Sequence, residues 1–345
     1  MIRGGTVDAR IGLKYGAGGR AMRALIEQVC LAGLGDTPVD GIGLAAMDDG
    51  AAIRVGDRWL VMTTDSHVVH PIFFPGGDIG RLAVAGTVND LAMMGATEVT
   101  GLTLAIVIEE GFPRADLERV YASIAAACRE ARATIVTGDT KVMGRGELDG
   151  LVINTSGAAM CDRVVPDSGL RPGDLVIVTG TVGDHGMAIM AARHQLALEG
   201  DLRSDVAPIN GLVRAALEAG GEGVVAMKDP TRGGLSSALH ELAGKGQVGI
   251  LLEELKVPVR AEVRGAADLL GIDPLVVANE GKAVIGVRPD RADAVLQALR
   301  AHPLGADAAI IGRCLDQHRG AVILDTGLGR RMLTEPEGEL LPRIC

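Results

Sequence analysis

The sequence predicts a mixed α and β (α+β) protein with two domains and a flexible C-terminal tail. Apolar segments of strand length alternate with amphipathic segments of helix length along most of the 345 residues, and 48% apolar residues suffice for two buried cores. The stretch 161–174 contains two prolines and a Pro-Gly pair, which is typical of a turn-rich connection between domains. We therefore expect domains at 1–165 and 166–325 and a tail at 326–345.

In the first domain, strand and helix patterns alternate from residue 51 onward. Two strands within 51–65 flank the turn Val55-Gly56-Asp57-Arg58. The other expected elements are a helix at 77–94, a strand at 98–108, a helix at 113–131, and strands at 133–138 and 150–160.

The second domain repeats this style without a short internal repeat. The pattern predicts a strand at 174–180, helices at 184–192 and 208–219, a strand at 223–228, a helix at 233–245, and further alternation to 324. Beyond residue 326 the sequence is rich in Gly, Arg, Glu and Pro, which favours a flexible tail.

Composition excludes several classes of function. Aromatic residues make up 2% of the chain and the net charge is −10, so neither base-stacking platforms nor the basic patches that bind nucleic acid are expected. The sequence has no run of about 18 apolar residues and no basic start followed by an apolar stretch. We expect a cytoplasmic protein that binds neither nucleic acid nor membrane.

The five cysteines do not suggest disulfides or a zinc site, because their number is odd and no two are close in sequence. Cys30, Cys128, Cys161 and Cys314 are expected to be buried apolar residues. Cys345 is different because it ends the chain, after a stiffening proline and the cation of Arg343, and an accessible thiol there suits chemistry. The alternative is a frayed terminus that happens to end in cysteine.

Acidic residues recur at the ends of apolar strands, beside glycine or threonine. Such turns can gather carboxylates around one pocket, and hard oxygen ligands suit Mg²⁺ held together with nucleotide phosphates. Any one of these turns alone is also typical of an ordinary turn or helix cap. The positions concerned are Asp48, Asp49, Asp65, Asn89, Asp90, Thr137, Gly138, Asp139 and Asp229.

Two glycine-rich turns and one polar island add to this pattern. The turns Tyr15-Gly16-Ala17-Gly18-Gly19 and Pro230-Thr231-Arg232-Gly233-Gly234 each precede a helix, where free N–H groups can face phosphate, although neither is a Walker loop. Glu280 and Lys282 lie between two apolar runs, so they form either a buried ion pair or part of a site.

These motifs together resemble the hydrogenase maturation protein family HypE, from about residue 10 to the end of the chain. HypE proteins belong to the aminoimidazole ribonucleotide synthetase-like (PurM-like) superfamily, with selenophosphate synthetase and thiamine-monophosphate kinase. The Asp-rich motifs resemble the whole superfamily, whereas the ending Pro342-Arg343-Ile344-Cys345 is specific to HypE. The other motifs are Asp48-Asp49, Thr64-Asp65-Ser66, Phe73-Phe74-Pro75-Gly76-Gly77, Gly86-Thr87-Val88-Asn89-Asp90, Val136-Thr137-Gly138-Asp139-Thr140-Lys141, Thr231-Arg232-Gly233-Gly234 and Asn279-Glu280-Gly281-Lys282.

The resemblance implies a fold, an activity and partners. It implies a PurM-like homodimer in which the N-terminal domains pair into a barrel-like β core, each followed by a C-terminal α/β sandwich domain. It also implies that a HypF-like carbamoyltransferase loads the thiol of Cys345 and that this protein, using ATP and Mg²⁺, dehydrates the carbamoyl group to a thiocyanate. The cyanide would pass to a HypC–HypD-like iron scaffold.

The same resemblance suggests roles for individual residues. Cys345 would carry the substrate, Glu280 would act as the base, and Lys141 and Lys282 would stabilise the transferred phosphoryl group. Nucleotide contacts would come from the carboxylate turns together with Thr231, Arg232 and Gly233. The candidate Mg²⁺ ligands are Asp48, Asp65, Asp90, Asp139 and Asp229.

One departure and two alternatives accompany this interpretation. HypE proteins generally have His-Gly-Ser-Gly-Gly where this chain has Tyr15-Gly16-Ala17-Gly18-Gly19, so an imidazole and a hydroxyl are replaced. A small-molecule kinase resembling thiamine-monophosphate kinase would stay active without Cys345. A non-catalytic carrier that presents the thiol would show no ATP hydrolysis dependent on Cys345.

Overall fold

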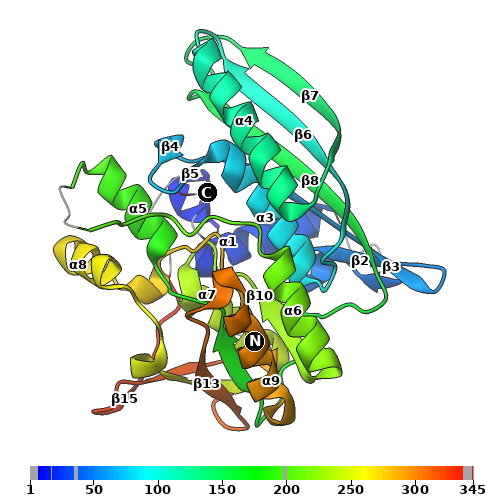
Figure 1. Ribbon diagram of the computed structural model, residues 1–345, viewed down its shortest axis with the longest axis vertical. Coiled ribbons are helices and arrows are strands. Elements are labelled where there is room, and N and C mark those ends of the chain that lie inside the picture. Colours follow the sequence, from blue (N-terminus) through cyan, green and yellow to red (C-terminus); the bar gives the residue numbers. More distant parts are fainter. Residues whose placement is uncertain (1–6, 17, 35–37, 197–199, 337–343, 345) are drawn as a thin grey trace.

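The described part of the chain forms two large sheets, each with its own helices, stacked along the long axis of the molecule, and one two-stranded sheet (Figure 1). The structure, a computed structural model, describes residues 7–16, 18–34, 38–196, 200–336 and 344. The mixed α and β class predicted from the sequence is confirmed.

The first sheet has the strand order β1-β2-β3-β8-β6-β7. Neighbouring strands are antiparallel except β6 and β7, which are parallel and joined by a helix. The strands are β1 (Gly41–Ile42), β2 (Ala51–Val55), β3 (Arg58–His67), β6 (Val99–Glu109), β7 (Ile135–Met143) and β8 (Leu151–Cys161), and a separate hairpin contains β4 (Phe73–Phe74) and β5 (Gly77–Asp78).

Helices α3 (Ile79–Met93) and α4 (Arg114–Ala131) cover one face of this sheet. The Asp78 carboxylate caps α3 by accepting hydrogen bonds from the Gly80 and Arg81 N–H groups at 2.8 and 2.9 Å. Ile79 and Leu82 of α3 are fully buried, and burying side chains of this size stabilises a fold by about 1.5–3 kcal/mol each. This packing fixes α3 against β3.

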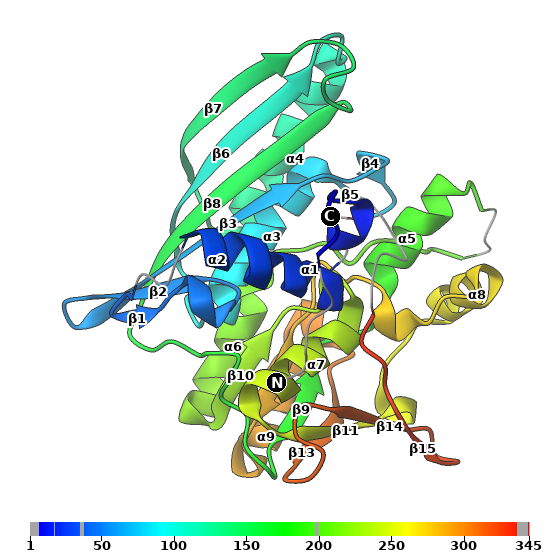
Figure 2. The same ribbon diagram turned by 180° about the vertical axis from the view of Figure 1, so that it is seen from behind.

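Over β6, β7 and β8 the opposite face of the first sheet is open, because the reverse view shows no helix of the described residues in front of these strands (Figure 2). Side chains of β8 alternate between buried and half-buried positions, as expected for a strand with one covered face. Met62 and Val136 are large apolar residues of this sheet with 46% and 62% of their surface exposed.

The second sheet has the strand order β10-β12-β9-β13-β11-β14-β15. Its strands are β9 (Leu175–Val178), β10 (Val224–Lys228), β11 (Gly249–Glu253), β12 (Val284–Val287), β13 (Ala309–Leu315), β14 (Val322–Asp325) and β15 (Arg330–Met332). The helices of this half are α5 (Asp184–Arg193), α6 (Asn210–Gly220), α7 (Gly234–Gly246), α8 (Ala261–Leu270) and α9 (Pro289–Ala301).

Both faces of the second sheet are buried. Val176 and Val178 of β9 pack with α7, whereas Ile177 between them packs with α6 and α9 on the other side. Because alternate side chains of one strand enter two cores, the apolar run of β9 has no period of two.

Short helices complete the chain. Before the first sheet lie α1 (Gly19–Leu25) and α2 (Ala32–Leu34), with a π-helical segment Ile26–Leu31 between them. Cys30 in that segment is exposed, so the expectation that it is buried was wrong, whereas Cys128, Cys161 and Cys314 are buried as expected. No helix within the described ranges is both long and apolar enough to cross a membrane.

The segment after residue 326 differs from the flexible tail that composition suggested. β15 pairs antiparallel with β14, and Leu333 beyond it is buried. The Leu333 carbonyl lies 3.1 Å from His240 Nε2, and Glu335 pairs with Arg23 at 2.7 Å. An edge strand and polar contacts therefore hold the chain in place as far as Pro336, although its composition is rich in Gly and Arg. Residues 337–343 lie outside the described part.

Candidate active site

A cavity of about 600 Å³ lies where the two halves of the chain meet. It is bounded by β3 and α3 of the first half, by the end of β10 and by α7 of the second half, and by the start of α1. Its polar lining residues include Gly18, Gly19, Arg23, Asp48, Asp49, Thr63, Thr64, Asp65, Asp90, Lys228, Asp229, Thr231, Arg232, His240, Glu241, Lys245 and Glu280.

The cavity gathers carboxylates from four separate segments. Asp48 and Asp49 lie in the loop before β2, Asp65 on β3, Asp90 on α3, and Asp229 directly after β10. The close approach of α3 to β3 brings two of these segments together. A Cβ atom at Gly86 would lie 2.7 Å from His67 Cε1 and 3.2 Å from Asp65 Oδ2, so only glycine fits there.

Two lysines that the sequence analysis did not identify organise the acidic groups. Lys228 Nζ lies 2.5 Å from Asp49 Oδ1 and 3.1 Å from Glu241 Oε2, and Lys245 Nζ lies 2.5 Å from Asp167 Oδ2. Burial disfavours the charge of Lys228, but Asp49 and Glu241 outweigh it and raise its pKa well above the ordinary value. The ammonium therefore stays charged inside the cavity.

Two carboxyl groups that face the cavity, those of Asp229 and Asp90, hold their protons more tightly than usual. Burial, followed by the nearby charge of Asp49, raises the pKa of Asp229 to about 8. Burial and repulsion by Asp229 likewise raise the pKa of Asp90 well above its ordinary value. A cation entering the cavity would relieve this repulsion, so the site favours positively charged ligands.

Glu280 brings a further carboxyl group to the cavity. Burial is the main cause that raises its pKa well above the ordinary value, and Asp229 and Asp65 add repulsion. Among the described residues, its Oε1 atom is buried without a hydrogen-bond partner. Its backbone is held firmly, because its N–H group donates to Asp205 Oδ1 at 3.0 Å. Such a carboxyl group is a stronger base than an exposed glutamate.

Both glycine-rich turns lie at the cavity. Gly18 and Gly19 line it, as do Thr231 and Arg232 of the second turn. A Cβ atom on Gly18 would lie 2.8 Å from the Arg232 carbonyl oxygen, so the turns pack against each other. Gly233 adopts a left-handed conformation as the N-cap of α7.

Tyr15, the first residue of the N-terminal turn, is buried, and its hydroxyl lies 2.6 Å from the Asp8 nitrogen. Ala17 lies outside the described residues.

Several residues proposed from the sequence do not line this cavity. Asn89 is buried and structural, since its side chain donates to the carbonyls of Ala207 and Glu280 and accepts from the Ile209 N–H group. Lys282 pairs with Asp205 at 3.2 Å rather than with Glu280, which excludes the buried Glu280–Lys282 pair. Cys345 lies outside the described residues.

The four candidates on β7 lie elsewhere. Thr137, Gly138, Asp139 and Lys141 belong to an exposed edge strand. In the pairing with β6, Asp139 and Lys141 stand beside Ala105 and Val107, which alternate with the buried Leu104 and Ile106. Asp139 and Lys141 therefore point to the open face of the sheet, away from α3 and from the cavity of their own chain.

The donor set of the cavity fits a magnesium ion that arrives with a nucleotide. Asp48, Asp65, Asp90 and Asp229 all face the cavity, yet no three potential ligands in the described ranges lie close enough to form a complete metal site. Mg²⁺ commonly takes one or two carboxylates and completes its shell with phosphate oxygens and water. Carboxylates, buried cations and glycine turns are together suited to binding a metal nucleotide.

Comparisons with known proteins agree with this picture. The family model for the N-terminal domain of AIR synthase related proteins matches residues 47–161, and that for the C-terminal domain matches 171–325. Fold and site thus define a PurM-like protein of the AIR synthase related class.

The particular family follows from full-length relatives. The chain is 47% identical to the carbamoyl dehydratase HypE of Rhizobium leguminosarum bv. viciae, over 98% of this chain and 96% of that protein. A HypE structure in complex with HypF superposes with a TM-score of 0.84 at 43% identity, covering 91% of this chain and 100% of that one. A HypE structure in complex with ATP gives 0.80 at 42% identity, covering 96% and 98%. The chain belongs to the HypE family.

Proposed function

We propose that this protein is an ATP-dependent carbamoyl dehydratase of [NiFe]-hydrogenase maturation that acts on its own C-terminal Cys345. The observation that carries the proposal is the cavity, which combines carboxylates for a metal nucleotide with the buried base Glu280. Full-length similarity to carbamoyl dehydratases supports the same activity.

The reaction explains why ATP is needed. The oxygen of an S-carbamoyl group is a poor leaving group, so it first attacks the γ-phosphorus of ATP and ADP departs. The C–O bond then breaks, the oxygen leaves with phosphate, and the nitrogen loses two protons as the C≡N bond forms. The net change is loss of one water from the thiocarbamate, coupled to hydrolysis of one ATP.

Residues of the cavity supply the groups that these steps require. Glu280 removes a proton from the nitrogen once its carboxyl group is ionised: burial favours the protonated form in the free protein, and the cation that binds with ATP would favour the carboxylate. Lys228 and Arg232 provide positive charge near the transferred phosphoryl group. Asp48, Asp65, Asp90 and Asp229 would hold Mg²⁺, which when bound neutralises the phosphate charge. A HypE structure that contains ATP supports the nucleotide part of the proposal.

The proposal includes a homodimer that gives Asp139 and Lys141 a function. Both residues point away from the cavity of their own chain, but they lie on the open face that also exposes Val136 and Met62. Pairing two such faces would bury the apolar side chains and bring Lys141 toward the cavity of the partner subunit. Lys282 would act indirectly by holding Asp205, which binds the Glu280 backbone.

Partners and location complete the proposal. A HypE structure in complex with HypF supports a HypF-like carbamoyltransferase as the enzyme that loads Cys345. A HypC–HypD-like iron scaffold would receive the cyanide, and a cytoplasmic location follows from the use of ATP. We also propose domain limits of 1–165 and 166–325, with β15 (Arg330–Met332) added to the second domain because it extends that sheet.

Phosphate release tests the proposed function. With HypF, carbamoyl phosphate and ATP, we expect one additional phosphate per carbamoyl group from the wild type and none from Cys345→Ala. Equal phosphate release by both proteins would contradict the proposal. Phosphorylation of an added small molecule by Cys345→Ala would favour a small-molecule kinase. ATP hydrolysis that does not respond to carbamoylation would favour a carrier.

A further inference from the structure

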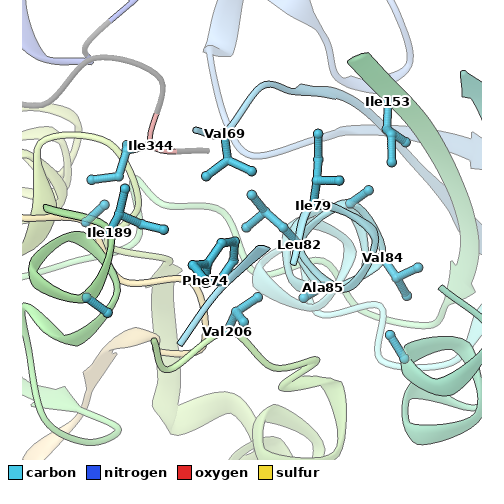
Figure 3. Packing of buried hydrophobic residues seen from close by; sticks show 14 of the residues in the cluster. Val69, Phe74, Ile79, Leu82, Val84, Ala85, Ile153, Ile189, Val206 and Ile344 are labelled. Carbon is cyan, nitrogen blue, oxygen red and sulfur yellow. The ribbon is translucent and has the colours of Figure 1, made fainter. Parts of the chain in front are cut away.

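The penultimate residue of the chain is docked in the main apolar core. Ile344 is only 5% exposed and belongs to the same cluster as Val69, Phe74 and Ile189. Figure 3 shows its side chain beside Ile189, with Val69 and Phe74 near it. A Cβ atom added to Gly186 would lie 3.0 Å from Ile344 Cδ1, so the missing side chain of this glycine makes room for the isoleucine.

A buried histidine binds the backbone of the same residue. His185 of α5 is fully buried, and its Nε2 lies 2.7 Å from the Ile344 carbonyl oxygen. A carbonyl oxygen only accepts, so Nε2 carries the proton and donates it. Burial lowers the pKa of His185, which keeps the ring neutral.

The other ring nitrogen is held in turn. Because neutral imidazole has one donor, Nδ1 accepts from the Ser204 hydroxyl at 2.8 Å, and Ser204 Oγ accepts from the Val206 N–H group at 3.0 Å. Phe74 fixes the ring plane by an edge contact, with centroids 5.5 Å apart and an angle of 89°. The His185 N–H group is therefore held pointing at the Ile344 carbonyl.

The docking site is joined directly to the peptide that carries Glu280. The Gly186 N–H group donates to the Ala278 carbonyl at 3.0 Å, and Ala278 is two residues before Glu280. Asp205, which accepts from the Glu280 N–H group, is next to Ser204 in the chain. One peptide unit, about 3.8 Å between Cα atoms, separates Ile344 from Cys345.

We propose that His185 is a positioning residue. It binds the Ile344 carbonyl, and the apolar site beside it holds the Ile344 side chain. Together these contacts hold the chain end so that the Cys345 thiol starts its reaction beside Glu280. The site selects a branched aliphatic penultimate residue. Its catalytic meaning rests on the proposed dehydratase function, but the docking itself can be tested without it.

Thiol accessibility tests the docking in the absence of HypF and ATP. N-ethylmaleimide labelling of Cys345 would be followed by peptide mass spectrometry in a Cys30→Ser background, because Cys30 is also exposed. We expect His185→Leu and Ile344→Ser to label at least about fivefold faster than the parent. His185→Gln, whose amide can donate at a similar position, and Ile344→Val, which largely fills the site, should label at rates near the parent.

Controls separate docking from general loss of structure. Ile344→Ser changes a residue at the chain end, so it should leave the fold intact and lower the midpoint of thermal unfolding by only a few degrees, and it tests the docking even where His185→Leu folds poorly. His194→Leu, at the end of the same helix, controls for loss of a histidine and should not alter labelling. Labelling within twofold of the parent for both His185→Leu and Ile344→Ser would overturn the proposal.

A second measurement tests positioning in the reaction. For carbamoylated His185→Leu, we expect the kcat of dehydration to fall at least tenfold with an unchanged KM for ATP, while HypF loads Cys345 as fast as in the parent or faster. His185→Gln should recover most of the lost kcat. Faster labelling with an unchanged kcat would overturn the positioning role. If the wild type itself does not dehydrate, the proposed function fails, and the labelling experiment still decides whether the chain end docks.

Discussion

At the scale of single residues, Glu280 is a side chain whose surroundings differ clearly from those of an ordinary carboxylate. It is buried, its pKa is raised by burial and by Asp229, and it faces the cavity. Glutamine has the same shape but is not a base, and it needs no proton to be neutral.

We predict that Glu280→Gln lowers the dehydration rate by about 10² to 10⁴ fold while leaving HypF-dependent carbamoylation intact. The measurement is conversion of carbamoylated protein in single-turnover experiments. Stability should be unchanged, since the wild-type group is itself held neutral by burial. Dehydration within threefold of the wild type would exclude Glu280 as the base.

Lys228 neutralises the carboxylates of Asp49 and Glu241 at the cavity. We predict that Lys228→Met lowers the free energy of unfolding by about 3–5 kcal/mol, because Asp49 and Glu241 lose their buried partner. Urea unfolding measures the change, and adding Asp49→Asn should restore part of it. A loss below about 1 kcal/mol, or no recovery in the double variant, would contradict this role.

The raised pKa of Asp229, about 8, predicts how nucleotide binding depends on pH. Below that pH the free protein holds the proton, whereas a cation bound with ATP favours the ionised carboxylate. Binding of Mg²⁺–ATP at pH 7 should therefore release protons, and the affinity should rise from pH 6 to pH 8.

Calorimetry in two buffers of different ionisation enthalpy measures this proton release. Asp325→Asn is a suitable control, because Arg330 lowers the pKa of Asp325 and its carboxyl group does not titrate in this range. Equal binding enthalpies in the two buffers would refute the assignment.

At the scale of elements, the edge strand β7 bears on two questions: the function of Asp139 and Lys141, and the association of two chains. It carries Asp139 and Lys141 on the open face, and it exposes Val136 with 62% of its surface. An exposed edge strand with apolar residues is suited to association.

If the proposed homodimer forms through this face, Val136→Glu should convert it to a monomer and remove dehydratase activity, while the circular dichroism stays native. Light scattering after size exclusion gives the mass. Leu255→Glu, at an equally exposed apolar position with 82% of its surface accessible, should remain dimeric and active. A wild type that is monomeric at micromolar concentration would contradict the dimer.

Most helices and strands could be predicted from sequence because their local patterns are strong. The predicted helix at 113–131 is observed as α4 (Arg114–Ala131), and the predicted strand at 150–160 as β8 (Leu151–Cys161). β15 was missed because its three residues, Arg330–Met332, have no apolar pattern and form a strand only through pairing with β14. The exposure of Cys30 was missed because an Ala- and Leu-rich helix resembles a core helix in sequence.

At the scale of the whole molecule, the site depends on how two halves of the chain meet. Turn chemistry indicated Asp48, Asp65, Asp90 and Asp229, and all four face the cavity. Lys228 and Lys245 carried no such signal, because a lysine at a strand end or on a helix is usually solvated, and only the assembled fold buries the first and partly covers the second. The motif that contains Lys141 could not predict on which face of the first sheet its side chain lies, because that face is set by the pairing of β7 with β6.

The central claim is that this chain dehydrates a carbamoyl group on its own terminal cysteine. Intact-mass spectrometry after incubation with HypF, carbamoyl phosphate and ATP tests it most directly, with Cys345→Ala and a non-hydrolysable ATP analogue as controls. We predict a carbamoyl adduct on Cys345 that loses one water only when hydrolysable ATP is present. An adduct that persists with ATP, or the same loss of water with the analogue, would contradict the claim.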